Sequence, residues 1–241
     1  MKAMLLAAGF GTRMQPITLS RPKALVEVGK MTLLERNIRY LKAFGVDELV
    51  INVHHFAEQI IDFLKEHDNF GITIHISDET DAVLETGGGL KRAAPYLQGN
   101  APFILMNVDI LTDLDLAKMR NFHAEHNALA TLAVTNRTSS RALLFDENFE
   151  LKGWQNDNTG EKILTTEQNI SLQKFAFSGV HILSPAIFEV IAQEGKFSII
   201  TTYLALAKQY AIYGFEHSES KLLDVGKPEA IEKAIHLFGG R

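Results

Sequence analysis

Short apolar runs alternate with helix-like segments along the first half of the chain. The runs have the pattern of strands that are buried on one or both faces, and they lie at residues 3–8, 48–53, 71–77 and 102–109. Between them, apolar residues recur at helical spacing in residues 33–46, 57–67 and 89–97, and Gly45 is a helix stop signal. Strands that alternate with helices in this way predict βαβ units and a mostly parallel sheet.

The second half has a less regular pattern. Residues 128–135 and 174–183 are predicted strands, and residues 146–162 between them are rich in turn formers. Further helices are predicted at residues 185–193, 198–210 and 228–238. The pattern therefore predicts one α/β domain over the whole chain: a Rossmann-like, mostly parallel central sheet flanked by helices, with β-rich insertions in the second half.

Composition narrows the class of protein. The 241 residues are 46% hydrophobic and 22% charged, which is typical of a globular domain, and the formal net charge of −5 argues against nucleic-acid or membrane partners. The absence of cysteine excludes disulfides, thiolate metal sites and a cysteine nucleophile. No apolar run approaches the ~18 residues of a membrane helix, and no signal-peptide pattern follows residues 2–8. We therefore expect a cytoplasmic protein.

The stretch AAGFGTRMQPITLSRPKAL, residues 7–25, follows the first predicted strand. In open parallel sheets ligands bind where the strands end, and Gly9 and Gly11 allow backbone amides to come close to a ligand. Arg13 offers a fork of donors that matches phosphate oxygens, and Lys23 offers a mobile positive charge. The alternative is a strand-exit turn in which both cations are merely solvated.

This stretch differs from two common phosphate loops. A dinucleotide-binding loop has a third glycine in G-x-G-x-x-G, where this chain has Met14, and a Walker loop has G-K-[ST] after its glycines, which is missing here. An NAD-binding domain is therefore disfavoured. The longer string G-x-G-T-R-M-x-P-x-T, followed by Arg-Pro-Lys, favours a ligand loop of another kind over a plain turn.

The string LAAGFGTRMQPITLSRPKALVEV resembles the signature of the sugar-1-phosphate nucleotidyltransferases, which join a nucleoside triphosphate to a sugar 1-phosphate and release pyrophosphate. The resemblance covers essentially the whole chain. E-T-G-G-G at 85–89, F-S-G at 177–179 and D-V-G at 224–226 are similar to the short bacterial type exemplified by N-acetylmuramate-1-phosphate uridylyltransferases. The resemblance implies the nucleotide-diphospho-sugar transferase fold, with a nucleotide-binding half at 1–135 and a sugar-binding half with C-terminal helices at 136–241.

The resemblance also implies roles for individual residues. The catalytic residues are the two cations Arg13 and Lys23, which also bind the nucleotide. The backbone of the stretch at 7–25 and of the glycine-rich stretch at 85–89 binds the nucleotide as well, through Ala7, Ala8, Gly9, Gly11, Thr12, Gly87 and Gly88. The carboxylates of Asp109 and Asp224 hold Mg²⁺, a hard cation that prefers oxygen ligands. The sugar phosphate is bound by Asn107, Arg141 and Gly179, with Lys162 as a further candidate and a simple bulge as the alternative at Gly179.

The resemblance favours an enzyme that takes UTP and the 1-phosphate of an N-acetylated amino sugar, with a role in cell-wall nucleotide-sugar biosynthesis. A mannose- or heptose-1-phosphate guanylyltransferase that uses GTP is the alternative within the class. A nucleotide-sensing module that binds without turnover is the alternative outside it. We expect a monomer or a homodimer.

Overall fold

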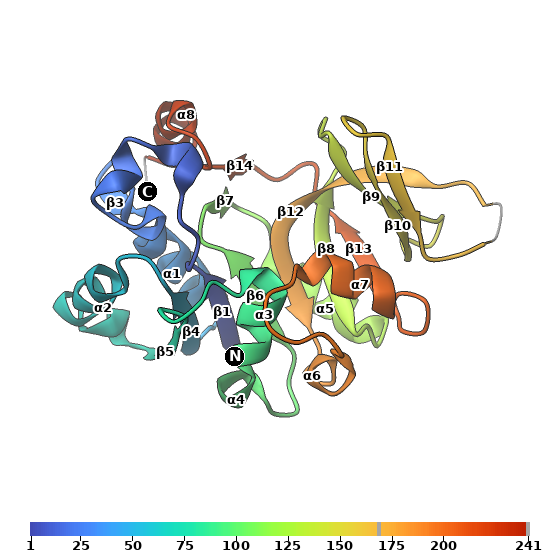
Figure 1. Cartoon of the computed structure of the whole chain (residues 1–241), viewed down its shortest axis with the longest axis horizontal. Coiled ribbons are helices and arrows are strands. Elements are labelled where there is room, and N and C mark those ends of the chain that lie inside the picture. Colours follow the sequence, from blue (N-terminus) through green and yellow to red (C-terminus); the bar gives the residue numbers. More distant parts are fainter. Residues whose placement is uncertain (168–169, 240–241) are drawn as a thin grey trace.

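The computed structural model describes residues 1–167 and 170–239, and a ten-stranded mixed sheet runs through its centre (Figure 1). Eight strands lie in the order β11-β10-β9-β12-β6-β1-β4-β5, while β8 pairs with β12 and β13 pairs with β8. The first-half strands are mutually parallel: β1 (Lys2–Leu6), β4 (Glu48–Val53), β5 (Thr73–Asp78) and β6 (Phe103–Asn107). The remaining strands pair antiparallel, apart from β13 with β8: β8 (Ala130–Thr135), β9 (Arg141–Phe145), β10 (Leu151–Asn156), β11 (Glu161–Leu164), β12 (Gln173–Leu183) and β13 (Ile212–Glu216).

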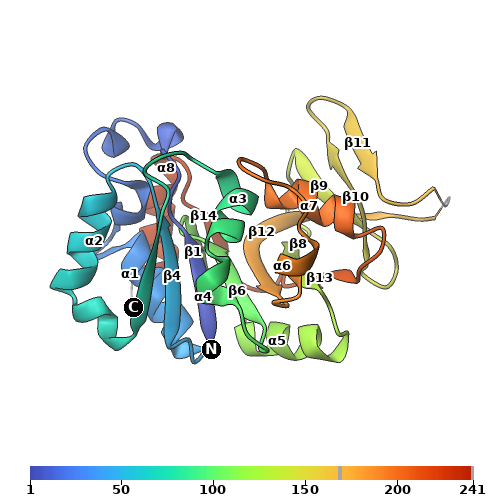
Figure 2. The same ribbon diagram turned by 60° about the horizontal axis from the view of Figure 1, so that its bottom comes forward.

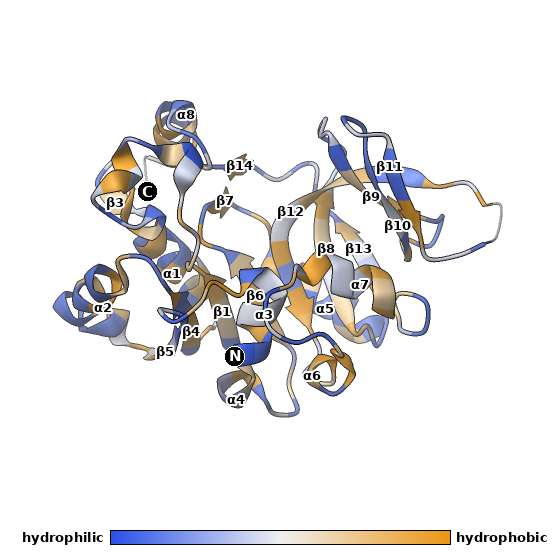
Figure 3. Ribbon diagram, in the orientation of Figure 1, coloured by the Kyte–Doolittle hydropathy of each residue, from blue (hydrophilic) through white to orange (hydrophobic). Residues whose placement is uncertain are grey.

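Helices cover both faces of the sheet (Figure 2). One hydrophobic cluster lies on the side of α1 (Leu33–Ala43), α2 (Ala57–Glu66) and α5 (Leu116–Glu125). A second lies on the side of α3 (Glu85–Arg92), α4 (Ala94–Leu97), α6 (Ile187–Val190) and α7 (Ile199–Leu206). Side chains of a strand alternate between the two clusters, so that Ala3 and Leu5 enter the first and Met4 enters the second. Figure 3 shows the central strands β1, β4 and β6 as predominantly hydrophobic. The predicted α/β class is confirmed.

Local signals set the ends of the best-predicted elements. Strand β4 has the predicted bounds, and α1 begins where the Thr32 hydroxyl accepts a hydrogen bond of 3.1 Å from the Glu35 amide. Two residues after α1, Gly45 takes a φ of 82°, which reverses the chain before β4.

A third, smaller hydrophobic cluster joins the loop after β1 (residues 7–25, called the first loop) to the C-terminal part of the chain. It includes residues of β2 (Glu27–Val28), β7 (Ile110–Thr112), β14 (Leu222–Asp224) and α8 (Glu229–Phe238), and β3 (Met31–Thr32) pairs with β2. Fully buried Met14 packs in it with Leu111 and Val225. The residue that differs from a dinucleotide-binding loop therefore anchors the loop from its buried side.

Three predictions of secondary structure are wrong. The glycines at 87–89 do not form a loop before a helix, because α3 already begins at Glu85. The turn-rich stretch at 146–162 contains β10, which pairs with β9 on one side and β11 on the other. The helix predicted at 185–193 spans only α6, since the carbonyls of Ile191 and Gln193 accept hydrogen bonds of 3.2 and 2.8 Å from Lys91 Nζ.

Strand β13 completes the sheet beside β8 and lies in a segment for which the hydrophobic pattern predicts no element. Within the described part of the chain, none of the helices combines the length and the apolar character that a membrane crossing requires.

Three histidines are buried in the core: His123, His181 and His217. His123 and His181 accept or donate one hydrogen bond each through Nδ1, to Thr131 Oγ1 at 2.9 Å and Tyr203 Oη at 2.8 Å, and His217 bonds Ser178 Oγ at 2.8 Å through Nε2. Burial lowers the pKa of His123 and His217 to about 4 and the pKa of His181 to about 3. All three side chains are therefore neutral in the folded protein near neutral pH.

We expect the protein to lose stability as the pH falls from about 6.5 towards 4. In that window the unfolded chain binds protons that the folded chain excludes, so each histidine removes about 1.4 kcal/mol of unfolding free energy per pH unit. Urea denaturation at pH 7.5 and 5 measures the loss. His123→Gln should flatten the pH dependence, whereas His126→Gln, at an exposed histidine of the same helix end, should not. Parallel curves for wild type and His123→Gln would contradict this expectation.

Candidate functional site

A cavity of about 380 Å³ opens at the carboxyl ends of the parallel strands. The segment after β1 contributes Ala7, Ala8 and Gly9, and β4 contributes Asn52 near its end. Its other walls come from the end of β6, the first turn of α3 and the cap of α7: Asn107, Val108, Asp109, Glu85, Thr86 and Ser198. Strand ends and a helix start thus meet at one concave surface, which is where open α/β sheets bind ligands.

The first loop presents its glycine backbone to this cavity. A Cβ on Gly9 would meet no protein atom within 4 Å, so the backbone there is open to a ligand. Gly11 takes a φ of 63°, and a Cβ on it would lie 3.0 Å from Thr18 Cγ2. The Thr18 hydroxyl donates to the Gly11 carbonyl at 2.8 Å, which holds the turn closed. Thr12 and Arg13 follow in a short helix, η1 (Thr12–Met14), whose end is anchored by buried Met14.

Two of the predicted charged residues form an ion pair at the cavity wall. Lys23 Nζ, at the start of the short helix η3 (Lys23–Leu25), donates to Asp109 Oδ2. Asp109 lies in the turn between β6 and β7. The side chain of buried Asn37 donates to the Val108 carbonyl at 2.8 Å, and the Val108 side chain packs in the core. These two contacts hold the turn that carries Asp109 against the interior of the protein.

Asp224 lies beside Asp109 although 115 positions separate them in the sequence. Strands β7 and β14 form a two-stranded antiparallel ladder in which Asp224 pairs with Ile110. The next residue, Val225, donates its amide to the Asp109 carbonyl at 2.8 Å. Partial desolvation at the rim and the negative charge of Asp109 raise the pKa of Asp224 above its ordinary value, against the charges of Lys23 and Arg13.

Arg13 faces the same carboxylate. A Cβ on Gly226 would lie 2.6 Å from Asp224 Oδ1 and 3.0 Å from Arg13 Nη2, so all three residues crowd one point. Glycine at 226 is needed for this approach, since any side chain would displace the carboxylate or the guanidinium. The structure thus brings together four predicted residues: Arg13, Lys23, Asp109 and Asp224.

The two carboxylates suit a divalent cation. Their oxygens are hard donors, and desolvation together with repulsion by the Asp109 charge raises the pKa of Asp224. A cation between Asp109 and Asp224 would relieve that repulsion. Mg²⁺ commonly takes one or two protein carboxylates and completes its shell with water and substrate phosphate.

A buried polar network that the sequence pattern did not single out supports the floor of the cavity. Asn52 Oδ1 accepts the Ala7 amide at 2.7 Å, and Asn52 Nδ2 donates to Glu79 Oε1 at 2.7 Å. Glu79 is fully buried and its other oxygen accepts the Leu84 amide at 3.2 Å; burial raises the pKa of this carboxyl. A polar residue inside the apolar run ELVINV was the available signal for Asn52.

Close packing explains the glycines of α3. A Cβ on Gly87 would lie 2.4 Å from the Phe197 ring, and one on Gly88 would lie 2.1 Å from the Gly195 carbonyl oxygen. A Cβ on Gly89 would lie 2.6 Å from Glu79 Oε1. Glu85 and Thr86 line the cavity from this helix, while Gly87 faces Phe197 and Gly88 faces the backbone of Gly195. Nucleotide binding by these two glycines stays a prediction.

The predicted sugar-phosphate residues are only partly together. Gly179, with a φ of 75°, sits where β12 shifts register, and a Cβ on it would lie 3.0 Å from Asn107 Nδ2, so these two residues are adjacent. Arg141 lines a different cavity, and Lys162 lies on β11, four strands from β6. Arg137, not singled out by the pattern, donates to the Phe177 carbonyl at 2.8 Å and its charge opposes the raised pKa of Asp224.

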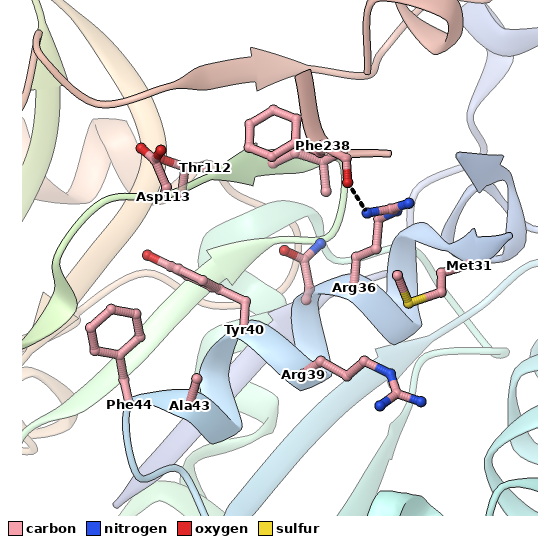
Figure 4. A pocket seen from close by; sticks show the side chains of 11 residues that line it. Met31, Arg36, Arg39, Tyr40, Ala43, Phe44, Thr112, Asp113 and Phe238 are labelled. Carbon is pink, nitrogen blue, oxygen red and sulfur yellow. Dashed lines mark hydrogen bonds between the residues drawn. The ribbon is translucent and has the colours of Figure 1, made fainter. Parts of the chain in front are cut away.

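Another cavity, of about 430 Å³, lies between α1, β7 and the end of α8 (Figure 4). It contains none of the predicted site residues. Arg36 crosses it and donates to the Phe238 carbonyl at 2.8 Å, and the Tyr40 hydroxyl donates to the Leu114 carbonyl at 2.6 Å. Its charged and polar groups serve to join α1 to α8 and to the segment after β7.

Known proteins of one kind match nearly the whole chain. Residues 2–238 match the family described as nucleotidyl transferase. The chain is 31% identical over 233 residues to the mannose-1-phosphate guanyltransferase of Yarrowia lipolytica, with 95% of this chain and 61% of that protein covered. It is 32% identical over 240 residues to the N-acetylmuramate alpha-1-phosphate uridylyltransferase of Caulobacter vibrioides, with 95% and 93% covered. The chain thus spans about three fifths of the fungal relative and most of the bacterial one.

Solved structures share the fold at lower identity. HddC from Yersinia pseudotuberculosis complexed with GMP-PN has a TM-score of 0.77 and 24% identity, with 98% of this chain and 99% of that chain covered. A UDP-glucose pyrophosphorylase complexed with UDP-glucose has a TM-score of 0.78 and 20% identity, with 100% and 99% covered. These two structures therefore show that the fold of this chain is similar to theirs.

The Asn52 network yields a prediction about stability. Asn52→Ala should lower the free energy of unfolding by about 2–4 kcal/mol, because it removes the partner of the Ala7 amide and of Glu79 Oε1 in a buried site. Urea denaturation measures the change. Asn148→Ala, at an exposed asparagine, is the control and should stay within about 0.5 kcal/mol of wild type. A loss at Asn52 no larger than the loss at Asn148 would contradict a supporting role.

Proposed function

The chain belongs to the nucleotidyl transferase family, and from this membership we propose that it transfers a nucleotidyl group from a nucleoside triphosphate to a sugar 1-phosphate and releases pyrophosphate. One observation carries the proposal: two cations and two carboxylates lie together, with Lys23 and Asp109 lining the strand-end cavity and Asp224 and Arg13 adjoining Asp109. Such a cluster suits a reaction between two polyanions, since their charge must be neutralised before they can approach.

The reaction forms one bond and breaks one. A phosphate oxygen of the sugar 1-phosphate bonds to the α-phosphorus, and the bond from that phosphorus to the bridging oxygen of the β-phosphate breaks. The attacking oxygen is already an anion near neutral pH, so no side chain has to act as a general base. The protein's task is therefore to align the two phosphates and to balance their charge.

The residues divide this task. The backbone amides at Gly9 and Gly11 cradle the triphosphate, and Arg13 and Lys23 hold its oxygens and stabilise the pyrophosphate as it leaves. Lys23 can turn from the Asp109 carboxylate towards a phosphate, since its ammonium is a mobile point charge. Asp109 and Asp224 would hold Mg²⁺, which when bound supplies further positive charge to the phosphate oxygens.

We assign the two substrates to two parts of the chain. Residues 1–135 bind the nucleotide and residues 136–241 bind the sugar. UTP and the 1-phosphate of an N-acetylated amino sugar are the favoured pair, on the identity to the bacterial uridylyltransferase over 93% of its length. GTP with mannose 1-phosphate is the second candidate, on the similar identity to the fungal guanyltransferases.

Pyrophosphate release tests the activity. Purified protein is first screened for thermal stabilisation by UTP, GTP, CTP and dTTP with Mg²⁺, and the best nucleotide is then offered with a panel of sugar 1-phosphates. We expect release that requires both substrates. Stabilisation by a nucleotide without release with any sugar phosphate would instead identify a sensing module.

Arg13→Ala and Lys23→Ala should each lower kcat by about 10²-fold or more, as does loss of a donor that stabilises transition-state charge. Lys30→Ala is the control, because it removes an exposed cation from the turn between β2 and β3, outside the cavity. Thermal melting confirms that each variant is folded. Near-normal turnover of the Arg13 and Lys23 variants would contradict their assignment.

A further inference from the structure

Strand β12 has a bulge beside the proposed reaction centre. Its pairing with β8 shifts register between Phe177 and His181, and Gly179 within this bulge takes a φ of 75°. A bulge bends its strand and changes the direction of the residues around it. The conformation of residues 178–180 therefore decides what lies against the end of β6, the neighbouring strand.

The bulge lies against two residues of the site. A Cβ on Gly179 would lie 3.0 Å from Asn107 Nδ2 and 2.8 Å from Ile110 Cγ1. Asn107 lines the strand-end cavity, and Ile110 pairs with Asp224 in the ladder between β7 and β14. Packed interiors transmit displacements, so a shift of the bulge would disturb both the cavity wall at Asn107 and the pairing that places Asp224.

A histidine from a distant part of the chain holds this bulge. His217 Nε2 and Ser178 Oγ share a hydrogen bond of 2.8 Å, and the two residues are buried, with exposed fractions of 6% and 0%. The imidazole is neutral near neutral pH, since burial lowers its pKa to about 4. Loss of such a bond in a buried site leaves a polar group without its partner. The bond therefore fixes Ser178, the residue directly before Gly179.

The same histidine lies at the start of the segment that leads to Asp224. Its amide donates to the Val134 carbonyl at 3.0 Å, next to the last pair of the ladder between β13 and β8. Its carbonyl accepts the Ser220 amide at 2.8 Å, and β14 begins at Leu222. His217 thus joins the bulge of β12 to the turn that precedes β14.

We propose that His217 is a positioning residue of the transfer reaction: its hydrogen bond to Ser178 holds the Gly179 bulge against Asn107, and so sets where the sugar phosphate lies relative to the two carboxylates. The proposal rests on the nucleotidyltransferase function proposed above. His217 is buried and acts through the bulge rather than by contact with a substrate. Such an indirect effect reaches the rate because a reacting group that is misplaced by a fraction of its size reacts more slowly.

Four variants separate positioning from a merely structural role. His217→Leu and Ser178→Ala each remove the hydrogen bond, and should His217→Leu fail to fold, Ser178→Ala decides the question, since it takes away a single oxygen. His217→Gln keeps an amide nitrogen near the place of Nε2. His123→Leu is the matched control, because buried His123 also bonds a hydroxyl, that of Thr131 at 2.9 Å, and neither of these residues lines the strand-end cavity.

Pyrophosphate release is measured with the nucleotide that stabilises the protein best and with the sugar 1-phosphate that reacts fastest, each varied while the other is saturating. We expect His217→Leu and Ser178→Ala to lower kcat/KM for the sugar 1-phosphate by about threefold to tenfold, the effect of one lost hydrogen bond, and to leave KM for the nucleotide within about twofold. The double variant should lose no more than either single variant, because both remove the same bond. His217→Gln should recover most of the loss.

His123→Leu should lower the melting temperature and leave the kinetic constants at their wild-type values. The same behaviour in His217→Leu and Ser178→Ala would overturn the proposal and leave the transfer reaction standing. An equal change in KM for the nucleotide would also overturn it, since the damage would then be general. Absence of pyrophosphate release by the wild type with every sugar phosphate would refute the transfer reaction itself, and this proposal with it.

Discussion

The short antiparallel ladder between β7 and β14 is the constraint on which the site depends. It returns a segment from the end of the chain to the end of a central strand, so that Asp224 pairs with Ile110 and the Val225 amide bonds the Asp109 carbonyl. The small cluster around Met14 packs the first loop onto the same ladder. One local pairing therefore brings two distant carboxylates and one phosphate-type loop to a common rim.

This arrangement gathers like charges, and the fold offsets the cost with cations already in place. Desolvation and the charge of Asp109 raise the pKa of Asp224, while Lys23 and Arg13 oppose that effect. A cluster of charged groups with a perturbed pKa at a cavity is typical of functional sites. Under the proposed function, the polyanionic substrates and a divalent cation would pair with these groups.

The parallel and antiparallel parts of the sheet support different sides of this rim. The parallel strands end at the first loop and at the Asn52–Glu79 network, where buried hydrogen bonds hold the backbone around Ala7. The antiparallel strands β9, β10 and β12 carry the separate cavity that Arg141 lines. Asn107 and Gly179 meet where β6 and β12 lie side by side. Under the proposed function, the sugar phosphate would bond to the α-phosphorus of the nucleotide at this junction.

The sequence by itself determined the parts that depend on neighbours along the chain. The spacing of apolar residues predicted β1, β4, β6 and α1, because the side chains that one face of a helix or strand buries recur with the period of that element. The spacing of glycines and cations in residues 7–25 predicted the first loop. Only the tertiary structure decided the rest. It decided that the glycines of α3 serve close packing, that Asn52 and Glu79 form a buried pair, that β10 is a strand, and that Arg141 is separated from Asn107. Each of these is set by a contact between segments far apart in sequence, which no local pattern records.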